Sequence, residues 1–424
     1  MRRFGIALAV VLGTLVAVGT CAAIPSKPTT EVTKKKKKKR PAPRKSAAAT
    51  SATPVHYASG KKPLATSLRA KSLTSTRLTS SQFMPSRSRK QVRIAYSPWT
   101  SPTFADSTMG DSVDGEDLVV RRAAVDALGP YNGTVVVADP SSGRILSIVN
   151  QKLALNSGFQ PCSTIKVVCA LAALSEGIIA RDTKLQLSKT SSMNMTEALA
   201  RSNNPYFASL GIKLGFERVH YYAKLYGLGE KAGIGIDGEK PGFLTAVPPK
   251  FGGVGMMTSF GEGIQLTPLQ LASLLSAIAN GGTLYHLQYP RTKADLASFT
   301  PRVKRQLDLG DHIPEVKPGM HGAVEFGTGR RAKYDSNEPI MGKTGTCTDR
   351  TTPTHLGWFG SFNEVGKNKL VVVVLLTGGK PVNGPVAAQV AGGVYKGLSQ
   401  QNFFAQAKIT APLSLVSTQA CCAR

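Results

Sequence analysis

Acidic residues, histidine and cysteine are all scarce in this chain of 424 residues. Only 25 Asp and Glu oppose 53 Lys and Arg, so the formal net charge is +28. The six cysteines are too sparse for a disulfide-stapled scaffold. The six histidines show no HExxH or Cys/His ligand spacing, and no phosphate-binding GxxxxGK motif or dinucleotide fingerprint occurs. We therefore expect neither a metal site nor a cofactor.

Long apolar runs are also rare, and the clearest one lies near the start of the chain. Arg2 and Arg3 precede the uncharged residues 4–26, whose centre, residues 6–18, is apolar. This order is typical of an export signal. A segment of this length could instead span a bilayer as a single anchor, and lipidation at Cys21 is a third alternative. The sequence thus predicts a signal peptide or membrane anchor in residues 1–26, with the remaining chain outside the cytoplasm.

The positive charge is concentrated directly after this segment. Residues 27–93 hold 19 Lys and Arg and a single acid, Glu31, which is a net charge of +18. Ser, Thr, Pro, Ala and basic residues dominate as far as residue 117, and they bury too little apolar surface to offset the entropy of ordering. We predict a disordered basic linker over residues 27–117. Its basic part either binds anionic polymers or a membrane surface, or is a solvated spacer; with an export signal ahead of it, no nucleic acid is expected.

From residue 118 to about residue 405 the hydrophobic pattern predicts one folded body, followed by a tail over residues 406–424. Strands alternate with helices in a recognisable order along this body. The expected strands are residues 133–139, 144–149, 340–347, 357–362 and 370–377. The expected helices are residues 163–174, 195–228 in pieces broken at 202–205, 267–278 and 386–398. This order predicts an α/β (α+β) fold in which helices cover an antiparallel sheet.

Ser163 and Lys166 stand three residues apart at the predicted start of an apolar helix. This spacing puts both side chains on one helix face, within reach of each other. A buried lysine can accept the serine proton because burial disfavours its charge, and the helix N-terminus stabilises the developing alkoxide. The pair is therefore a candidate nucleophile and base, although serine and lysine at this spacing are more often solvated.

Two further polar segments are candidates on the same grounds. Residues 202–204, Ser-Asn-Asn, interrupt a helical region, where they could either line a cleft or simply cap a helix. Residues 343–346, Lys-Thr-Gly-Thr, lie in a predicted strand, where the glycine would allow another backbone to approach closely. An ordinary edge strand with a surface lysine is the alternative for this segment.

Together, in this order, the three segments carry the patterns S-x-x-K, S-x-N and K-T-G, and the sequence resembles the transpeptidase domain of penicillin-binding proteins. The likeness extends over roughly residues 118–402, with Cys162 departing from the glycine that usually precedes the nucleophile. It implies a five-stranded antiparallel sheet with helices on both sides, as in β-lactamases and transpeptidases. Further similar segments are residues 132–149, 202–207, 267–272, 277–283, 327–329 and 357–359.

The resemblance also implies a role for each site residue. Ser163 would attack the carbonyl between the two terminal D-alanines of a peptidoglycan stem peptide, with Lys166 as base. Ser202 would relay the proton to the leaving nitrogen, and Asn204 would hold Lys166 and a substrate amide. Lys343 would tune Ser202 and attract the substrate carboxylate.

The remaining implied roles concern recognition of the substrate carboxylate and the oxyanion. The hydroxyls of Thr344 and Thr346 would lie near the carboxylate, on either side of Gly345. The backbone N–H groups of Ser163 and Thr346 would form the oxyanion hole. The implied function is a D,D-transpeptidase or D,D-carboxypeptidase that works through an acyl-serine intermediate. Its partners would be stem peptides, β-lactam antibiotics, anionic wall polymers through residues 27–93, and other proteins of cell-wall synthesis.

Two alternatives share the same three motifs. A class A β-lactamase needs an additional glutamate followed after three residues by asparagine, and the acids after the second motif, Glu239 included, show no such spacing. A β-lactam-binding sensor is the other alternative, although such sensors usually follow several membrane spans. Residues 27–117 are too short and polar for a glycosyltransferase or pedestal domain, so we expect no glycan polymerisation.

Cys162 and Cys347 each adjoin a residue that the resemblance assigns to the oxyanion hole. Two amide nitrogens that bind one oxygen lie within roughly 6 Å of each other. Their neighbours can then reach the Cα separation of about 4.4–6.8 Å that a disulfide tolerates. The pair also resembles a bridge in carbapenem-hydrolysing class A β-lactamases, which keeps that alternative open. We predict a disulfide in an oxidising compartment, with two packed free thiols as the alternative.

Overall fold

The computed structural model describes residues 99–155, 158–349 and 353–405. The predictions for residues 1–26, for the linker as far as residue 98 and for the tail 406–424 lie outside the described residues. None of the helices in the described part of the chain combines the length and the apolar character that a membrane crossing requires.

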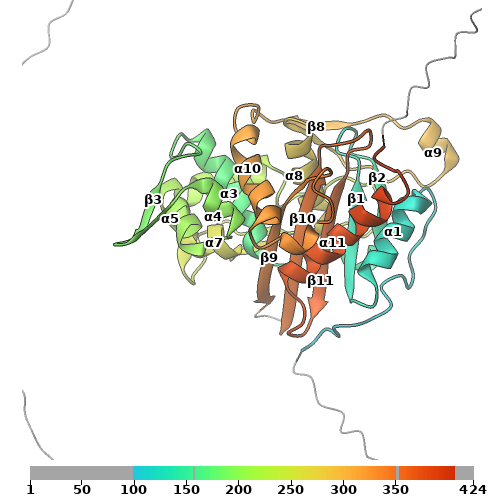
Figure 1. The fold of residues 1–424 in the computed structure, drawn as a ribbon, viewed down its shortest axis with the longest axis horizontal. Helices are drawn as coiled ribbons and strands as arrows, with labels where there is room; N and C mark the ends of the chain where they lie inside the picture. Colours follow the sequence, from blue (N-terminus) through green and yellow to red (C-terminus); the bar gives the residue numbers. More distant parts are fainter. Residues whose placement is uncertain (1–98, 156–157, 350–352, 406–424) are drawn as a thin grey trace, which may run out of the picture. The chain divides into compact units, whose positions relative to one another are not determined.

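The central element is a five-stranded antiparallel sheet with the strand order β2-β1-β11-β10-β9 (Figure 1). This architecture confirms the predicted fold class. Strand β9, which contains the Lys-Thr-Gly-Thr segment, lies at one edge. The strands are β1 (Gly133–Ala138), β2 (Ile145–Val149), β9 (Ile340–Asp349), β10 (Thr354–Asn363) and β11 (Val371–Gly378).

Helices cover both faces of this sheet, which explains why strands β1 and β11 are almost uninterrupted apolar runs. Along β1, Val135 and Val137 pack with α1 (Leu118–Leu128) and α11 (Gly384–Ser399), while Val136 belongs to the core on the opposite face. Helix α8 (Pro268–Ala279) packs on that opposite face, against β1, β10 and β11 (Figure 1). Because successive strand residues point to opposite faces, burial on both faces requires apolar residues at every position.

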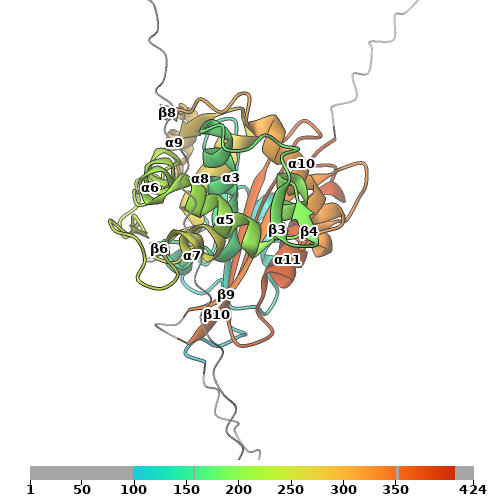
Figure 2. The same ribbon diagram turned by 90° about the vertical axis from the view of Figure 1, so that its left-hand side faces the viewer.

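A group of helices lies beside the β9 edge of the sheet, where α3, α5 and α7 are neighbours (Figures 1 and 2). In the described residues, three small two-stranded sheets, β3-β4, β5-β6 and β7-β8, lie outside the central sheet. The remaining helices are α2 (Gln151–Leu155), η1 (Cys162–Ile165), α3 (Lys166–Ser175), α4 (Met195–Ala200), α5 (Asn204–Leu214), α6 (Phe216–Leu225), α7 (Gly253–Phe260), α9 (Lys293–Ala297), α10 (Ile313–Glu325) and η2 (Arg330–Ala332). The strands of these small sheets are β3 (Leu185–Ser188), β4 (Ser191–Met193), β5 (Phe243–Leu244), β6 (Ile264–Gln265), β7 (Thr283–Tyr285) and β8 (Val303–Gln306).

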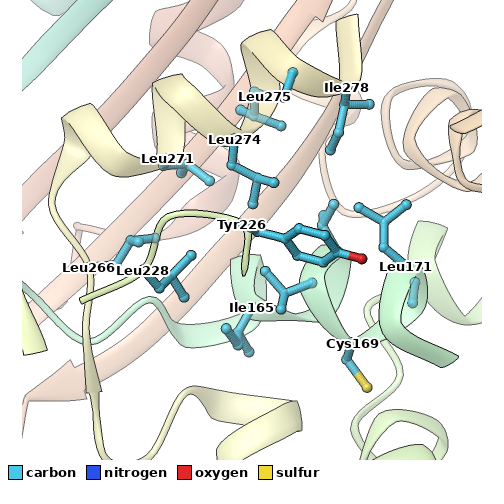
Figure 3. Packing of buried hydrophobic residues seen from close by; sticks show 14 of the residues in the cluster. Ile165, Cys169, Leu171, Tyr226, Leu228, Leu266, Leu271, Leu274, Leu275 and Ile278 are labelled. Atoms are coloured by element: carbon cyan, nitrogen blue, oxygen red, sulfur yellow. The ribbon is translucent and has the colours of Figure 1, made fainter. Parts of the chain in front are cut away.

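Helix α8 is the central helix of the larger core, and all of its residues are buried. It starts with a reciprocal cap, in which Thr267 Oγ1 accepts from the Gln270 N–H at 3.1 Å and Gln270 Oε1 accepts from the Thr267 N–H at 2.8 Å. Figure 3 shows the buried ring of Tyr226 beside Leu274 of α8 and Leu171 of α3. This packing fixes α3, which follows the candidate nucleophile, relative to the sheet.

Helix α10 was not predicted, and its sequence shows why. Pro314 lies in its first turn and Pro318 in its interior, where proline normally breaks a helix. The helix nevertheless forms because it packs against α4 and β9, with Val316 and Met320 fully buried. Tertiary burial therefore outweighs the local preference, which no pattern in the segment itself reveals.

Residues 99–117 are a correction to the predicted linker, because they pack on the folded body. Arg121 of α1 donates to Asp111 Oδ2 at 2.8 Å and to Glu116 Oε2 at 3.0 Å. The Glu116 carboxylate is buried and also accepts from the hydroxyl of Tyr289 at 2.5 Å. The low apolar content of the segment predicted disorder. Buried ion pairs with Arg121, and the hydrogen bond from Tyr289, which lies 173 residues after Glu116, order the segment instead.

We expect Arg121→Met to lower the free energy of unfolding by about 3 kcal/mol, because it leaves two carboxylates without their cation in a buried setting. Chemical denaturation of the full chain measures this change. Arg122→Met is the matched control, since Arg122 is the next residue of α1 and is exposed. The network would be dispensable if both variants unfolded at the same denaturant concentration as the parent chain.

Candidate active site

The candidate nucleophile lies where a short 3-10 helix, η1, leads into α3. Cys162 precedes it with φ of 51°, a left-handed conformation that favours glycine. The Gln160 carbonyl just before this turn accepts from the buried Trp358 Nε1 at 2.9 Å, which ties the turn to β10. Ser163 itself is only 8% exposed. This backbone angle is a physical reason for the glycine that usually stands at this position in the family that the sequence resembles.

The side chain of Lys166 is fully buried and connects two of the three motifs. Its Nζ donates to Ser163 Oγ at 2.9 Å, as the three-residue spacing predicted, and to Ser202 Oγ at 3.0 Å. It also donates to the Ser202 carbonyl at 2.8 Å and to Asn204 Oδ1 at 2.5 Å. Burial lowers the pKa of Lys166 to about 7, so the neutral amine is accessible near physiological pH.

The Ser-Asn-Asn segment connects α4 to α5, and Asn204 is the first residue of α5. One of its side chains caps α5, and the other two bind Lys166. Asn203 caps α5, because its Oδ1 accepts from the Tyr206 N–H at 2.8 Å. Ser202 has φ of 57°, an uncommon conformation for a non-glycine residue. The turn directs Ser202 and Asn204 toward Lys166. Of the two alternatives given for this segment, the structure shows the helix cap at Asn203, while Ser202 and Asn204 bind Lys166.

Strand β9 brings Lys343 next to Ser202, although the two residues are 141 positions apart in the sequence. Lys343 Nζ donates to Ser202 Oγ at 2.9 Å and to the Thr344 carbonyl at 3.0 Å. Burial holds the pKa of Lys343 well below its usual range, and the nearby Lys166 lowers it further. The hydroxyl of Ser202 thus lies between two buried amines, an arrangement suited to proton transfer.

Gly345 allows β9 to approach the helix that carries the nucleophile. A Cβ atom at this position would lie 2.9 Å from the Pro161 carbonyl oxygen and 3.2 Å from Thr164 Cγ2. Thr344 is buried, whereas Thr346 is exposed, and the Thr346 hydroxyl accepts from the Gly384 N–H at 2.7 Å. The strand and η1 therefore lie close together at the residues proposed from the sequence.

A disulfide joins Cys162 to Cys347 across this contact, with a Cα–Cα distance of 5.6 Å. It links the residue before Ser163 to the residue after Thr346, so it holds the nucleophile's turn against β9. The free cysteine in the described residues is Cys169, which is buried in α3.

We expect a non-reducing digest of protein made in an oxidising compartment to contain the peptides of Cys162 and Cys347 linked to each other, and reduction to separate them. Mass spectrometry of both digests gives the answer. Alkylation of these two thiols in the folded, oxidised protein would refute the bridge, and the buried Cys169 should stay unlinked in either case.

Two side chains at the site lie in segments that carry the resemblance, 202–207 and 327–329, but were assigned no role from the sequence. The ring of Phe207 lies 5.7 Å from Lys166 Nζ, and Thr328 Oγ1 lies 2.5 Å from Thr344 Oγ1. Phe207 follows Asn204 by three residues on α5, so helical spacing could have placed it on the same face. No local signal connects Thr328 to Thr344. In the described ranges, no group of three or more His, Cys, Asp or Glu side chains is arranged to hold a metal ion.

Comparisons with known proteins show which curated proteins this chain is similar to. Stage V sporulation protein D of Bacillus subtilis is 29% identical over 310 residues, which cover 64% of this chain and 48% of that protein. The peptidoglycan D,D-transpeptidase MrdA of Haemophilus influenzae is 24% identical over 355 residues, covering 65% of this chain and 54% of that protein. The chain therefore spans about half the length of these relatives.

A solved structure is similar as well. The D,D-transpeptidase domain of a peptidoglycan glycosyltransferase from Eggerthella lenta has a TM-score of 0.56 and 21% identity, over 68% of this chain and 82% of that one. This likeness shows a shared fold. The model of the penicillin binding protein transpeptidase domain matches residues 133–396, which is more than half of the chain. The protein therefore belongs to the penicillin-binding protein transpeptidase domain family.

Proposed function

We propose that this protein is a serine D,D-transpeptidase or D,D-carboxypeptidase that acts on the D-alanyl-D-alanine ends of peptidoglycan stem peptides. The observation that carries the proposal is the position of Lys166 Nζ, which lies 2.9 Å from Ser163 Oγ and 3.0 Å from Ser202 Oγ. A buried amine between two hydroxyls can take a proton from one and supply it through the other. The name of the relative MrdA, a peptidoglycan D,D-transpeptidase, supports the same activity.

The reaction begins when Ser163 Oγ attacks the carbonyl carbon between the two D-alanines, while neutral Lys166 accepts the hydroxyl proton. The C–N bond then breaks, and Ser202 passes a proton to the departing D-alanine nitrogen. The product of this half-reaction is an ester between Ser163 and the shortened peptide. An amine of a second strand, or water, attacks this ester and restores the serine hydroxyl. A β-lactam ring presents the same carbonyl and remains bound to Ser163.

Substrate recognition is assigned to the strand side of the site. The backbone N–H groups of Ser163 and Thr346 stabilise the oxyanion, each contributing on the order of 3 kcal/mol to the barrier. Lys343 attracts the terminal carboxylate of the substrate, together with the hydroxyls of Thr344 and Thr346. Asn204 holds Lys166 and binds a substrate amide.

The proposed setting is the outer side of the cytoplasmic membrane, where stem peptides are found. Residues 1–26 act as an export signal or anchor in this proposal, and residues 27–93, with 19 basic residues, contact anionic wall polymers or the membrane surface. The relatives named above include a peptidoglycan transpeptidase, which supports this location. Other proteins of cell-wall synthesis are the expected protein partners.

A class A β-lactamase would need an additional glutamate as the base that hydrolyses the acyl-enzyme. Glu239 is buried and instead accepts from the Gly233 and Ile234 N–H groups at 2.9 and 3.1 Å. Glu230 forms ion pairs with Arg305 and Lys304. Both carboxylates thus have structural partners, which are backbone N–H groups for Glu239 and basic side chains of β8 for Glu230. We propose that the acyl-enzyme formed with a β-lactam is hydrolysed slowly and therefore persists.

The test is incubation of the full chain with a fluorescent penicillin and, separately, with a stem-peptide donor in the presence and absence of an amine acceptor. A stable penicilloyl adduct on Ser163 and a cross-linked or shortened peptide are the expected products. Rapid release of hydrolysed penicillin would instead identify a β-lactamase. A stable adduct without any peptide product would identify a sensor.

The rate of acylation should depend on pH because Lys166 must be neutral to accept a proton. Its pKa is lowered by burial to about 7, so the amine is mostly protonated below that pH and mostly free above it. We expect the acylation rate constant to rise about tenfold per pH unit below this pKa and to level off above it. Stopped-flow labelling between pH 5 and pH 9 measures the profile, and a rate independent of pH would exclude Lys166 as the base.

A further inference from the structure

A hydroxyl pair links the strand of the active site to a loop with no assigned role. Thr328, between α10 and η2, places its Oγ1 atom 2.5 Å from Oγ1 of Thr344 on β9, and either atom can be the donor. Thr344 is only 3% exposed, so its hydroxyl has little access to water. At this distance the two hydroxyls share one hydrogen bond.

The position of Thr328 is set by close backbone contacts. Its N–H donates to the Ala200 carbonyl at 3.2 Å, at the end of α4 and two residues before Ser202. A Cβ atom on Gly327 would lie 2.1 Å from that same carbonyl oxygen, so only glycine fits there. Thr328 therefore touches the helix that leads to Ser202 with its backbone and strand β9 with its side chain.

The direction of this hydrogen bond decides whether the Thr344 hydroxyl can donate its proton to a substrate carboxylate. A threonine hydroxyl has one proton to donate and two lone pairs that accept. If Thr344 donated to Thr328, its proton would be unavailable to a substrate carboxylate. If Thr328 donates, the lone pair of Thr344 is satisfied and the Thr344 proton is free to bind an anion. A carboxylate near Lys343 favours the second arrangement, because it accepts hydrogen bonds and cannot donate.

We propose that the Thr328 hydroxyl donates to Thr344 Oγ1 and thereby directs the Thr344 proton toward the terminal carboxylate of the substrate. Thr328 is thus a positioning residue for carboxylate recognition. This inference rests on the proposed function, because it takes the ligand to be a D-alanyl carboxylate or the carboxylate of a β-lactam.

The test compares acylation of the full chain by benzylpenicillin and by its methyl ester, which lacks the negative charge. Thr328→Val removes the hydroxyl at nearly constant volume. With benzylpenicillin we expect the second-order acylation constant to fall by about tenfold, the loss of one hydrogen bond to a charged group, mainly through weaker binding before acylation. With the methyl ester the same substitution should change the constant by less than about twofold, because the charge that Thr344 recognises is absent.

Two control variants distinguish an effect of the Thr328 hydroxyl on carboxylate binding from an effect on the stability of the fold. Thr328→Ser keeps the hydroxyl and should restore the constant for benzylpenicillin to within about threefold of the parent chain. Thr283→Val changes a threonine on β7 that hydrogen-bonds Gln306, and it should have no effect on either ligand.

The possible outcomes are distinct. An equal loss with benzylpenicillin and its ester would show that Thr328 only supports the fold, and would overturn the inference. An unchanged constant with benzylpenicillin would overturn it as well. A parent chain that forms no adduct with either ligand would instead overturn the proposed function, and with it this inference.

Discussion

Replacing Ser163 by alanine is expected to abolish covalent labelling by penicillin, because it removes the hydroxyl that donates its proton to Lys166 and forms the ester. Mass spectrometry should show a penicilloyl adduct on the parent chain and none on the variant. The fold should persist, since the change removes a single oxygen from a side chain that is 8% exposed. Circular dichroism and the midpoint of chemical unfolding, compared between the variant and the parent chain, test whether the fold persists.

Ser191→Ala is the matched control for that experiment. Ser191 is an exposed serine on the short strand β4, so its replacement should leave labelling unchanged. An adduct of the same mass on Ser163→Ala would show that another residue is the nucleophile, and peptide mapping would identify it. Ser202, which also bonds Lys166, is the first residue to inspect in that case.

Replacing Lys166 by methionine should slow acylation by about 10² or more, the usual cost of removing a general base. Methionine has a similar length but no amine, so the Ser163 hydroxyl loses the group that accepts its proton. The variant should not unfold more easily, because burial already disfavours the ammonium form of Lys166 in the native state. A slow adduct of the correct mass on Ser163 is therefore the expected result, measured by the rate of fluorescent labelling.

Lys213→Met is the matched control, since Lys213 is an exposed lysine of α5. Its labelling rate should equal that of the parent chain. If Lys166→Met were labelled within about threefold of the parent rate, the base would be another group, and the second buried amine, Lys343, would be the next to replace.

Much of the fold follows from patterns in the sequence. Strands β1 and β11 and helix α8 were predicted because they are apolar at most positions, as elements covered on both faces or on all sides require. Helix α10 was not predicted, because Pro318 contradicts the local helical signal. The ordered segment 99–117 was missed for a related reason. Its order comes from Arg121 and Tyr289, which lie outside it in the sequence.

The three motifs were identified from the sequence because each consists of neighbouring residues. Ser163 and Lys166 lie three apart on consecutive helical turns, so the geometry of one helix is enough to bring them together. The Thr328–Thr344 hydroxyl pair, by contrast, joins two elements through a loop whose path no local pattern predicts.

The chemical groups of the site were thus determined by the sequence alone, while their pKa values and mutual distances were decided by the tertiary structure. Ser202 and Lys343 are 141 residues apart, yet their side chains lie 2.9 Å from each other. Only the packing of α3, α5 and β9 around a common core creates that contact and removes water from both lysines. Because a pKa depends on burial and on neighbouring charges, the reactivity of Lys166 arises only when the whole domain has folded.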